Sequence, residues 1–450
     1  MLHPSRLLVR FLLLALVTAG SLYAWRAHFR AWNPGMRLPL LSYDAAQYAV
    51  AARELADRGT LTTLYALPLE LSKHPTPPWP LAVVQPGLVL AEAPLFKFVE
   101  PENELGTPEA PFRLTWDREW LALIVPFLSY VALALLIALT TVHLPGGPGG
   151  TSYILGAAAA GVAAFGVILD PEAQLFASGG FTEMPFTFGW LAALCGFAMR
   201  SARLDAMAHP RWVPVDRPSI WDRAPHLTSA PAFAIAVGLT LGFTGLVRGS
   251  MLWMAPLMAY GLALANPENR RQIFWLTLAA YAAPLLPWWI YKWRAFGSPG
   301  WDLSALSVWD RVQGHSWFSL FHLPVLPELP NGLAAFGALF RKVVDNVPVV
   351  LVALLSGLRG LWLVALIFWV VTERERKGLR AVGVVILLAV AANVLVVAAS
   401  VPVLRYLFPS RIALELPGLL AMWDLLGRLF RFGATATGIL ALRAGLALMV

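Results

Sequence analysis

The sequence predicts an all-α integral membrane protein with ten or eleven transmembrane helices, and three features of its composition support this fold class. Hydrophobic residues make up 58% of the 450 residues, while charged residues make up only 13%, about half of their share in soluble domains. So few charges could not cover the polar surfaces of two or three soluble domains. The 19 tryptophans also fit this class, since tryptophan gathers at the lipid–water boundary of membrane proteins.

Apolar runs of roughly 20 residues, the length that crosses a bilayer core, define the predicted spans. In chain order they cover residues 7–25, 119–144, 152–169, 183–199, 231–247, 250–265, 273–291, 351–371, 381–401 and 407–426. An eleventh candidate, 433–450, has Arg443 at its middle and could lie on the membrane instead. Arg411 and Glu415 are four residues apart, so we expect them to pair with each other on one helix face. A single cysteine, Cys195, excludes an internal disulfide and a cysteine-based metal cluster.

Basic residues in the short loops predict the orientation of the chain. With a cytoplasmic N-terminus, four of the five predicted cytoplasmic loops are rich in Arg and Lys, as the positive-inside rule requires. This distribution accounts for most of the net charge of +8 without a nucleic-acid partner. The same topology makes residues 1–450 a single polytopic membrane domain with two long external loops, 26–118 and 292–350, and long loops are where function concentrates.

The first external loop is expected to carry amphipathic helices. One runs from Asp44 to about Arg58, with Asp44 as its N-cap and Gln47 three residues later, a capping-box pattern. A second apolar run, 88–98, is too short to span the membrane and is expected to lie in the interface. Asp44 has two compatible interpretations: it caps the helix, or its carboxylate, kept ionised by the helix dipole, accepts a proton or binds a cation.

Four local patterns, in order between Ser42 and Leu426, resemble one known group. They are Asp44-x-x-x-Tyr48 followed by a proline-rich segment, Thr182-Glu183-Met184-Pro185-Phe186, Pro287-Trp288-Trp289 with Phe296-Gly297-Ser298-Pro299, and Arg405-Tyr406-Leu407. Together they resemble polytopic glycosyltransferases of the GT-C superfamily, in particular the bacterial relatives of protein O-mannosyltransferases and aminoarabinose transferases. Many of those relatives carry two adjacent acids in the first loop, whereas Ala45 follows Asp44 here. A divalent metal ion as cofactor therefore stays open.

The resemblance implies a GT-C-like bundle with a long first external loop, and it implies sugar transfer. The donor would be a polyprenyl-phosphate sugar, and the acceptor would be a hydroxyl group of a protein, a lipid or a glycan. Transfer would take place on the outer face of the cytoplasmic (inner) membrane. The predicted topology agrees, because the acids and arginines in question all fall at or beyond the outer ends of spans: Asp44, Asp170, Glu172, Glu183, Arg248 and Arg405.

Such a reaction needs a base for the acceptor hydroxyl and cations for the leaving phosphate. Asp44 is our candidate base, since a positioned carboxylate contributes about 10²–10⁴ in rate. Arg405, then Arg248, are candidates for the phosphate, which a guanidinium binds through paired, charge-assisted hydrogen bonds. Arg359 is a third candidate because charges inside a span are often functional. The alternative for these arginines is that they extend to lipid headgroups at the interface.

The remaining candidates would contact the sugar or the acceptor. Glu183 could position a sugar hydroxyl or a cation, or it could simply be an acid in the first turn of a helix. Tyr48, Tyr406 and His74 belong to the patterns and the proline-rich segment described above, and we predict that they bind sugar or acceptor.

Three other classes of function are considered besides a transferase that inverts the anomeric configuration of the sugar. The first is another enzyme using the same face, either a lipid-to-glycan ligase or a lipid-phosphate transferase. The second is a scaffold without activity, and the third is a lipid or glycan transporter. A lipid or glycan transporter would show repeats and broken helices with polar groups near the midplane. The sequence shows no repeat, and apart from Arg359, the Arg411–Glu415 pair and Arg443, the spans carry few charges away from their ends. This pattern favours an enzyme.

Overall fold

We describe the fold from a computed structural model, which places residues 4–32, 41–82, 84–98, 116–143, 152–208, 229–312, 314–316, 319–320, 322–356, 359–415 and 418. The elements in chain order are α1 (Pro4–Trp32), α2 (Tyr43–Arg58), β1 (Thr62–Thr63), α3 (Pro68–Leu71), β2 (Trp79–Pro80), α4 (Pro86–Phe98), α5 (Trp116–His143), α6 (Ser152–Ile168), α7 (Pro171–Ser178), α8 (Glu183–Ala208), α10 (Ala230–Val247), α11 (Met251–Ala265), η3 (Pro267–Asn269), α12 (Arg270–Phe296), η4 (Leu303–Trp309), α14 (Gly332–Leu355), α15 (Arg359–Thr372), α16 (Lys377–Ala399) and η5 (Leu404–Leu407).

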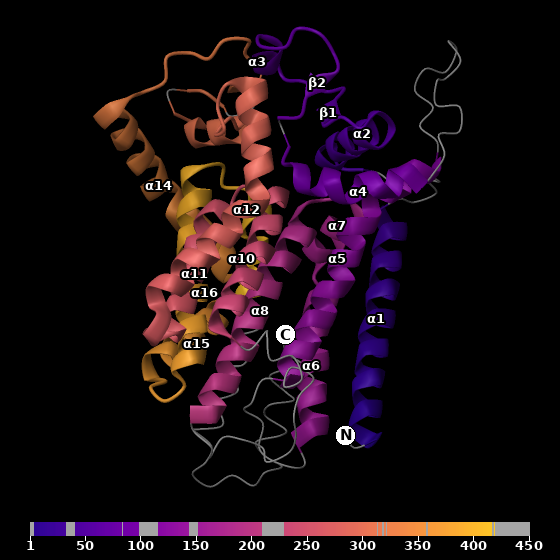
Figure 1. The fold of residues 1–450 in the computed structure, drawn as a ribbon, viewed down its shortest axis with the longest axis vertical. Helices are drawn as coiled ribbons and strands as arrows, with labels where there is room; N and C mark the ends of the chain where they lie inside the picture. The colour runs from indigo at the N-terminus through magenta and orange to yellow at the C-terminus, as the bar shows by residue number, and fades with distance from the viewer. Residues whose placement is uncertain are drawn as a thin grey trace.

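Most of these helices run along the length of the molecule as a bundle (Figure 1). At one end of the bundle lie α2, α3 and the two short strands, while α1 begins at the opposite end. Below them α4, which contains the short apolar run 88–98, lies across the direction of the long helices. The strands β1 and β2 pair antiparallel, Thr62 with Pro80 and Thr63 with Trp79. The proline-rich segment therefore folds back beside the end of α2.

Among the residues that the structure describes, five helices are long and apolar enough to cross a membrane. They are α1 over Leu8–Trp32, α5 over Trp120–Thr141, α10 over Ala230–Val247, η3 with α12 over Pro267–Phe296, and α16 over Lys377–Ala399. The bent pairs α6–α7 and α14–α15 raise the number to seven if each counts as one span. The protein is thus a multi-pass membrane protein, and the predicted all-α fold class is confirmed.

The predicted count of ten spans differs from seven at three places. The helix α8 has 26 residues and is long enough, but it begins with Glu183 and contains charged residues in its second half. It is therefore not among the helices that are apolar enough to cross a membrane. The helix α11 has only 15 residues, fewer than the roughly 20 that cross a bilayer core. The predicted spans 407–426 and 433–450 lie largely outside the described residues. Within the described part of 407–426, residues 408–415 are helical.

The prediction of one continuous span over 351–371 is wrong. Extended backbone at Ser356 ends α14 after Leu355, and α15 starts at Arg359 at an angle of 95° to α14. An apolar run indicates that a segment is hydrophobic but not whether its helix axis is straight, so the sequence did not reveal this bend. As a result, Arg359 lies at the start of a helix and not in the middle of a span.

Close packing of α10 against α12 fixes the end of α10, where Arg248 follows. A Cβ atom added to Gly238 would lie 2.4 Å from the carbonyl oxygen of Thr277, and one added to Gly242 would lie 2.5 Å from that of Tyr281. Only glycine allows the two backbones to come so close, which is a common device in membrane helix pairs.

The segment between α1 and α5 is held on the last turns of α12. The Lys73 ammonium donates a hydrogen bond to the Phe296 carbonyl at 3.0 Å, a favourable place for a cation at a helix C-terminus. The Tyr291 hydroxyl accepts from the Leu81 N–H at 2.8 Å and donates to the Leu61 carbonyl at 2.5 Å. These contacts join the two halves of the chain at the end of the bundle where α2 lies.

A small separate core holds α1 against the bundle. It consists of Leu13, Val17 and Ala24 of α1 packed on small residues of α5 and α6, namely Ala134, Ala138, Ala160 and Ala164, together with Ile168. The main core lies inside the bundle and extends to α2 and α4.

Candidate active site

The first turn of α2 presents Asp44 at the edge of the site. Ser42 is the N-cap of this helix, because its hydroxyl accepts a hydrogen bond from the Ala45 N–H at 3.1 Å. The prediction that Asp44 caps α2 is therefore wrong. Serine and aspartate are about equally good caps, and with the cap supplied by Ser42, the carboxylate of Asp44 can pair with another group.

The turn between α7 and α8 supports the start of α2. The Ser42 N–H donates to the Gly179 carbonyl at 3.1 Å. The next residue, Gly180, has a φ of +74°, and a Cβ atom there would lie 2.7 Å from the Cβ of Ala45. Glycine is required at this position both for the backbone conformation and for the close approach of α2.

Four charged side chains from four elements meet beside this turn. Asp44 comes from α2, Glu183 is the first residue of α8, Arg248 follows α10, and Arg405 lies in η5. The Nη1 atom of Arg405 lies 2.9 Å from Oδ2 of Asp44, and its Nε atom lies 3.6 Å from Oε1 of Glu183. The Nη1 atom of Arg248 lies 2.5 Å from the same Glu183 oxygen. The structure therefore brings the candidate base and two candidate phosphate ligands together.

Burial changes steadily across this cluster. The side chain of Glu183 is 2% exposed and that of Arg248 is 21% exposed, whereas Arg405 and Asp44 are 30% and 38% exposed. Burial acts to lower the pKa of Arg405, but the carboxylates of Glu183 and Asp44 outweigh it and raise the pKa above its usual value. Arg405 is thus always a cation. The two acids and two arginines balance, so an incoming anion competes with Asp44 for Arg405.

Aromatic rings line the two guanidinium groups. The ring centroid of Tyr406 lies 5.2 Å from Cζ of Arg405 and 5.0 Å from Cζ of Arg248. Phe181 lies 5.7 Å from Arg405, and Phe186 lies 5.9 Å from Arg248. These are cation–π distances, and the rings restrict the positions that the arginines can take. Our sequence argument missed Phe181, although it stands one residue before the Thr182-Glu183 pattern.

The three residues predicted to bind sugar or acceptor lie in different places. Tyr406 is in the site, as described. Tyr48 is buried one turn after Asp44 in α2, where burial raises the pKa of its hydroxyl. His74 is not part of the cluster: its Nε2 atom lies 2.7 Å from the Ala295 carbonyl near the end of α12.

Arg359, the third candidate for phosphate, belongs to a second charged cluster. Its Nη2 atom lies 3.4 Å from Asp170 Oδ2, and its Nε atom lies 3.2 Å from Glu415 Oε1. Arg411 pairs with Asp170 at 3.2 Å and also with Glu172. The prediction that Arg411 pairs with Glu415 is therefore wrong, because the acids at the start of α7 bind Arg411 instead. This cluster joins α7, α15 and the helical residues 408–415.

The fold can be compared with solved structures, whereas no family model and no curated protein matches the sequence. The crystal structure of ArnT from Cupriavidus metallidurans bound to undecaprenyl phosphate is similar, with a TM-score of 0.51 and 14% identity over 96% of this chain and 68% of that one. The crystal structure of the Archaeoglobus fulgidus oligosaccharyltransferase in complex with Zn and sulfate gives a TM-score of 0.50 and 14% identity over 97% of this chain.

The chain shares the fold of these two proteins. It spans 50% of the length of the archaeal oligosaccharyltransferase. At 14% identity, the similarity establishes the shared fold alone. The fold nevertheless agrees with the four sequence patterns, three of which contribute three of the four charged residues of the site: Asp44, Glu183 and Arg405. The fourth, with Trp288 and Phe296, forms the end of α12 on which the loop segment rests.

The acidic residues of the four-residue cluster pair with arginines and are not arranged as a group of metal ligands. Among the described residues, no three His, Cys, Asp or Glu side chains form a group that could hold a metal. Asp44 and Glu183 each face a guanidinium group, and Ala45 occupies the position of the second acid of many relatives. A cation bound here would have to displace an arginine.

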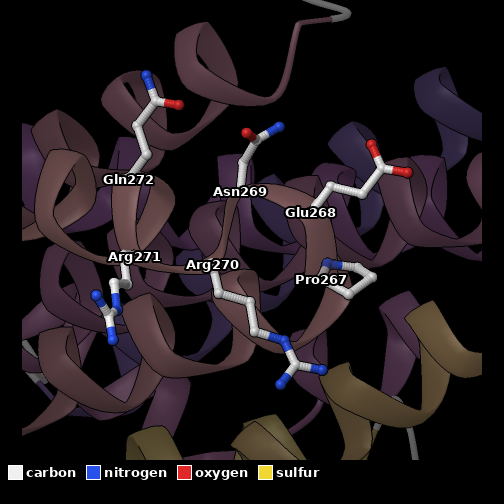
Figure 2. A pocket seen from close by; sticks show the side chains of 6 residues that line it. All are labelled: Pro267, Glu268, Asn269, Arg270, Arg271 and Gln272. Carbon is white, nitrogen blue, oxygen red and sulfur yellow. The ribbon is translucent and has the colours of Figure 1, made fainter.

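A surface hollow at the other end of the bundle carries no comparable chemistry (Figure 2). It lies between α11 and α12, one helix length away from Arg248. Its side chains point in different directions and do not converge on one position. They belong to Pro267, Glu268, Asn269, Arg270, Arg271 and Gln272.

Proposed function

We propose that this protein is an inverting glycosyltransferase that moves a sugar from a polyprenyl-phosphate donor to an acceptor hydroxyl on the outer face of the cytoplasmic membrane. The observation that carries the proposal is the placement of Arg405 between Asp44 and Glu183, at 2.9 and 3.6 Å, within a GT-C fold. One similar structure, ArnT, was crystallised bound to undecaprenyl phosphate, which supports a donor of that class here.

The arginines suit the charge that develops on the leaving group. A polyprenyl-phosphate sugar carries one negative charge on its phosphodiester, and the phosphate released by transfer carries up to two. Arg405 and Arg248 would bind this charge more strongly in the transition state than in the ground state, and such differential binding is what accelerates a reaction. The aromatic rings beside both groups keep them aligned for this purpose.

Donor binding would also prepare the base. In the free protein Arg405 holds Asp44, and a donor phosphate that binds Arg405 competes with this ion pair. The released carboxylate of Asp44 then accepts the proton of the acceptor hydroxyl. The acceptor oxygen forms a bond to the anomeric carbon, the bond from that carbon to the phosphate oxygen breaks, and its electron pair stays on the phosphate.

Inversion follows from the number of accessible carboxylates in the site. A retaining enzyme needs a second carboxylate as nucleophile, but Glu183 is 2% exposed and held by Arg248 at 2.5 Å. Asp44 is therefore the one carboxylate of the four-residue cluster that can reach a substrate. A single displacement with one base inverts the anomeric configuration.

The outer face is supported by the position of the site along the chain. The N-terminus of α1 lies at the end of the bundle opposite to α2 (Figure 1). The basic loops predicted to be cytoplasmic include Arg270 and Arg271, which lie at the far end of α11 from Arg248. With the basic residues inside, Asp44 and its partners face outside.

The test is transfer of labelled sugar from a polyprenyl-phosphate donor by membranes that contain the protein. Asp44→Asn should lower the rate by about 10²–10⁴ without changing insertion, and Tm should fall by no more than the small amount expected for an accessible ion pair. The matched control is Asp57→Asn, at the exposed end of the same helix, which should keep full activity. Normal transfer by Asp44→Asn would remove Asp44 as the base.

The bent helices favour one second candidate, a lipid or glycan transporter. Asp170 lies at the bend between α6 and α7 and Arg359 at the start of α15, and charged groups at broken helices occur in transporters. Product analysis separates the candidates. A glycosyltransferase releases polyprenyl phosphate, a lipid-phosphate transferase retains the phosphate on the sugar, and a transporter leaves the donor intact.

A further inference from the structure

The segment that carries Arg405 is braced along α7, and we propose that Arg411 is the residue that fixes this brace and so positions Arg405. The catalytic consequence of this inference rests on the proposed function, while the positioning itself is a property of the fold. Arg411 follows Arg405 by six residues, through η5 and into the helical residues 408–415.

The first end of the brace is an ion-pair anchor at the start of α7. Asp170 is the N-cap of α7, and its Oδ1 atom accepts from the N–H groups of Glu172 and Ala173 at 2.8 and 3.1 Å. The other oxygen of Asp170 faces Arg411 at 3.2 Å, and Glu172 also pairs with Arg411. Because the cap fixes the Asp170 carboxylate, Arg411 is bound to a rigid point.

From this anchor the two segments run antiparallel. In the middle, the ring of Phe408 packs edge-on against Phe176 with centroids 5.0 Å apart. Beyond the end of α7, the ring of Phe181 lies 5.7 Å from the guanidinium of Arg405. Three contacts thus follow one another along the two segments: Arg411 with Asp170, Phe408 with Phe176, and Arg405 with Phe181. The ion pair at Asp170 therefore fixes the position of one segment along the other.

The opposite side of the segment is held by α16. The amide of Asn393 donates to the Tyr406 carbonyl at 3.0 Å and to the Ser410 hydroxyl at 2.8 Å. These two bonds hold the segment on its α16 side. Arg411 holds it on the α7 side, so that the segment is fixed from both sides.

The anchor is strong because it is buried. The side chains of Arg411 and Asp170 are 10% and 6% exposed, and a buried ion pair that loses one partner is left with an uncompensated charge. Arg359 still pairs with Asp170 at 3.4 Å, so this acid keeps a cation when Arg411 is removed. The expected consequence is therefore a turn of residues 404–411 with loss of the Arg405 alignment, and not collapse of α7.

The test is a set of double-mutant cycles read by Tm, which needs no activity. In the native background, the Tm shifts of Asp44→Asn and Arg405→Gln should be non-additive, because these side chains are paired at 2.9 Å. In an Arg411→Gln background the two shifts should become additive. Glu172→Gln, a milder change at a half-exposed partner, should reduce the non-additivity in part and serves if Arg411→Gln does not fold.

The control is Arg376→Gln. Arg376 is also a largely buried arginine, paired with Glu373 at 2.6 Å, but it lies at the other end of α16 from η5. Non-additivity should survive in this background. Non-additivity that survives equally in the Arg411→Gln and Glu172→Gln backgrounds, or that is absent from the native protein, would overturn the inference.

Binding of undecaprenyl phosphate gives a second measure. The Kd should rise about tenfold in Arg411→Gln and return towards the native value in Arg411→Lys, while Arg376→Gln should bind normally. A native protein that does not bind this lipid would overturn the proposed donor, and the Tm cycles would still decide whether Arg411 positions Arg405. Unchanged lipid binding in Arg411→Gln with additive Tm shifts would show that the Arg405 alignment does not serve the donor, and that outcome would overturn the catalytic consequence.

Discussion

Replacement of Arg248 by glutamine would leave the Glu183 carboxylate, which is 2% exposed, without the partner that lies 2.5 Å away. Removing one member of a buried ion pair costs about 3–5 kcal/mol, since the other charge stays buried and uncompensated. Arg405 remains 3.6 Å from Glu183, so we expect the lower end of this range, about 3 kcal/mol.

This loss can be expressed as a change in Tm. Unfolding entropy is about 2.1 cal/mol/K per residue, which over 450 residues gives roughly 0.9 kcal/mol/K. A loss of about 3 kcal/mol then lowers Tm by roughly 3 °C. The comparison variant is Arg405→Gln, whose partner Asp44 is 38% exposed. Accessible ion pairs contribute about 0–1 kcal/mol, so this variant should lose roughly 1 °C or less while also losing transfer activity.

The assay is thermal unfolding of the purified protein in detergent for both single variants and for Arg248→Gln combined with Glu183→Gln. The double variant should recover most of the stability, because a neutral amide replaces the stranded carboxylate. Equal Tm losses for Arg248→Gln and Arg405→Gln would refute the argument from burial. So would a double variant less stable than Arg248→Gln alone.

Three further predictions concern other parts of the molecule. Burial raises the pKa of Glu70 to about 7, above its unfolded value, so its contribution to stability is complete below about pH 4.5 and is lost as pH rises towards 7; Glu70→Gln should flatten Tm against pH over this range. Gly87→Ala places a Cβ atom 2.6 Å from the backbone of α10 and should lower Tm by several degrees, whereas Gly166→Ala, which meets nothing within 4 Å, should be neutral or slightly stabilising. Topology reporters fused after Gly59, Trp309 and Arg405 should all show an external position. A cytoplasmic signal at Gly59 would contradict the proposed mechanism.

The sequence predicts the helical membrane fold well, because apolar runs of sufficient length leave few alternatives in a bilayer. It fails where direction changes within such a run. The bend between α14 and α15 follows from the backbone at Ser356 and from the ion pairs that hold Arg359 against Asp170 and Glu415. These partners are far away along the chain, so no local pattern marks the bend.

The sequence allowed individual residues of the candidate site to be selected, but it did not show which of them contact each other. Asp44 and Arg405 were each selected from their positions beyond span ends, yet nothing local shows that they contact each other across most of the chain. Spacing also misled the assignment of Arg411 and Glu415, because the i, i+4 rule considers a single helix. Within the bundle, the acids of α7 compete for the same guanidinium and bind it.

The packing of α1 has a consequence for how the protein is made. The helix rests on α5, α6 and α7, and its core partners lie between Ala134 and Ile168. All of these residues leave the ribosome after α1 and after the whole segment that carries Asp44. This helix therefore enters the bilayer before the residues of α5 and α6 that pack against it, and its apolar side chains must hold it there until those helices arrive. The alanine face that packs against α1 forms only once α5 and α6 have been inserted, so the contacts of α1 are completed well after this helix has been made.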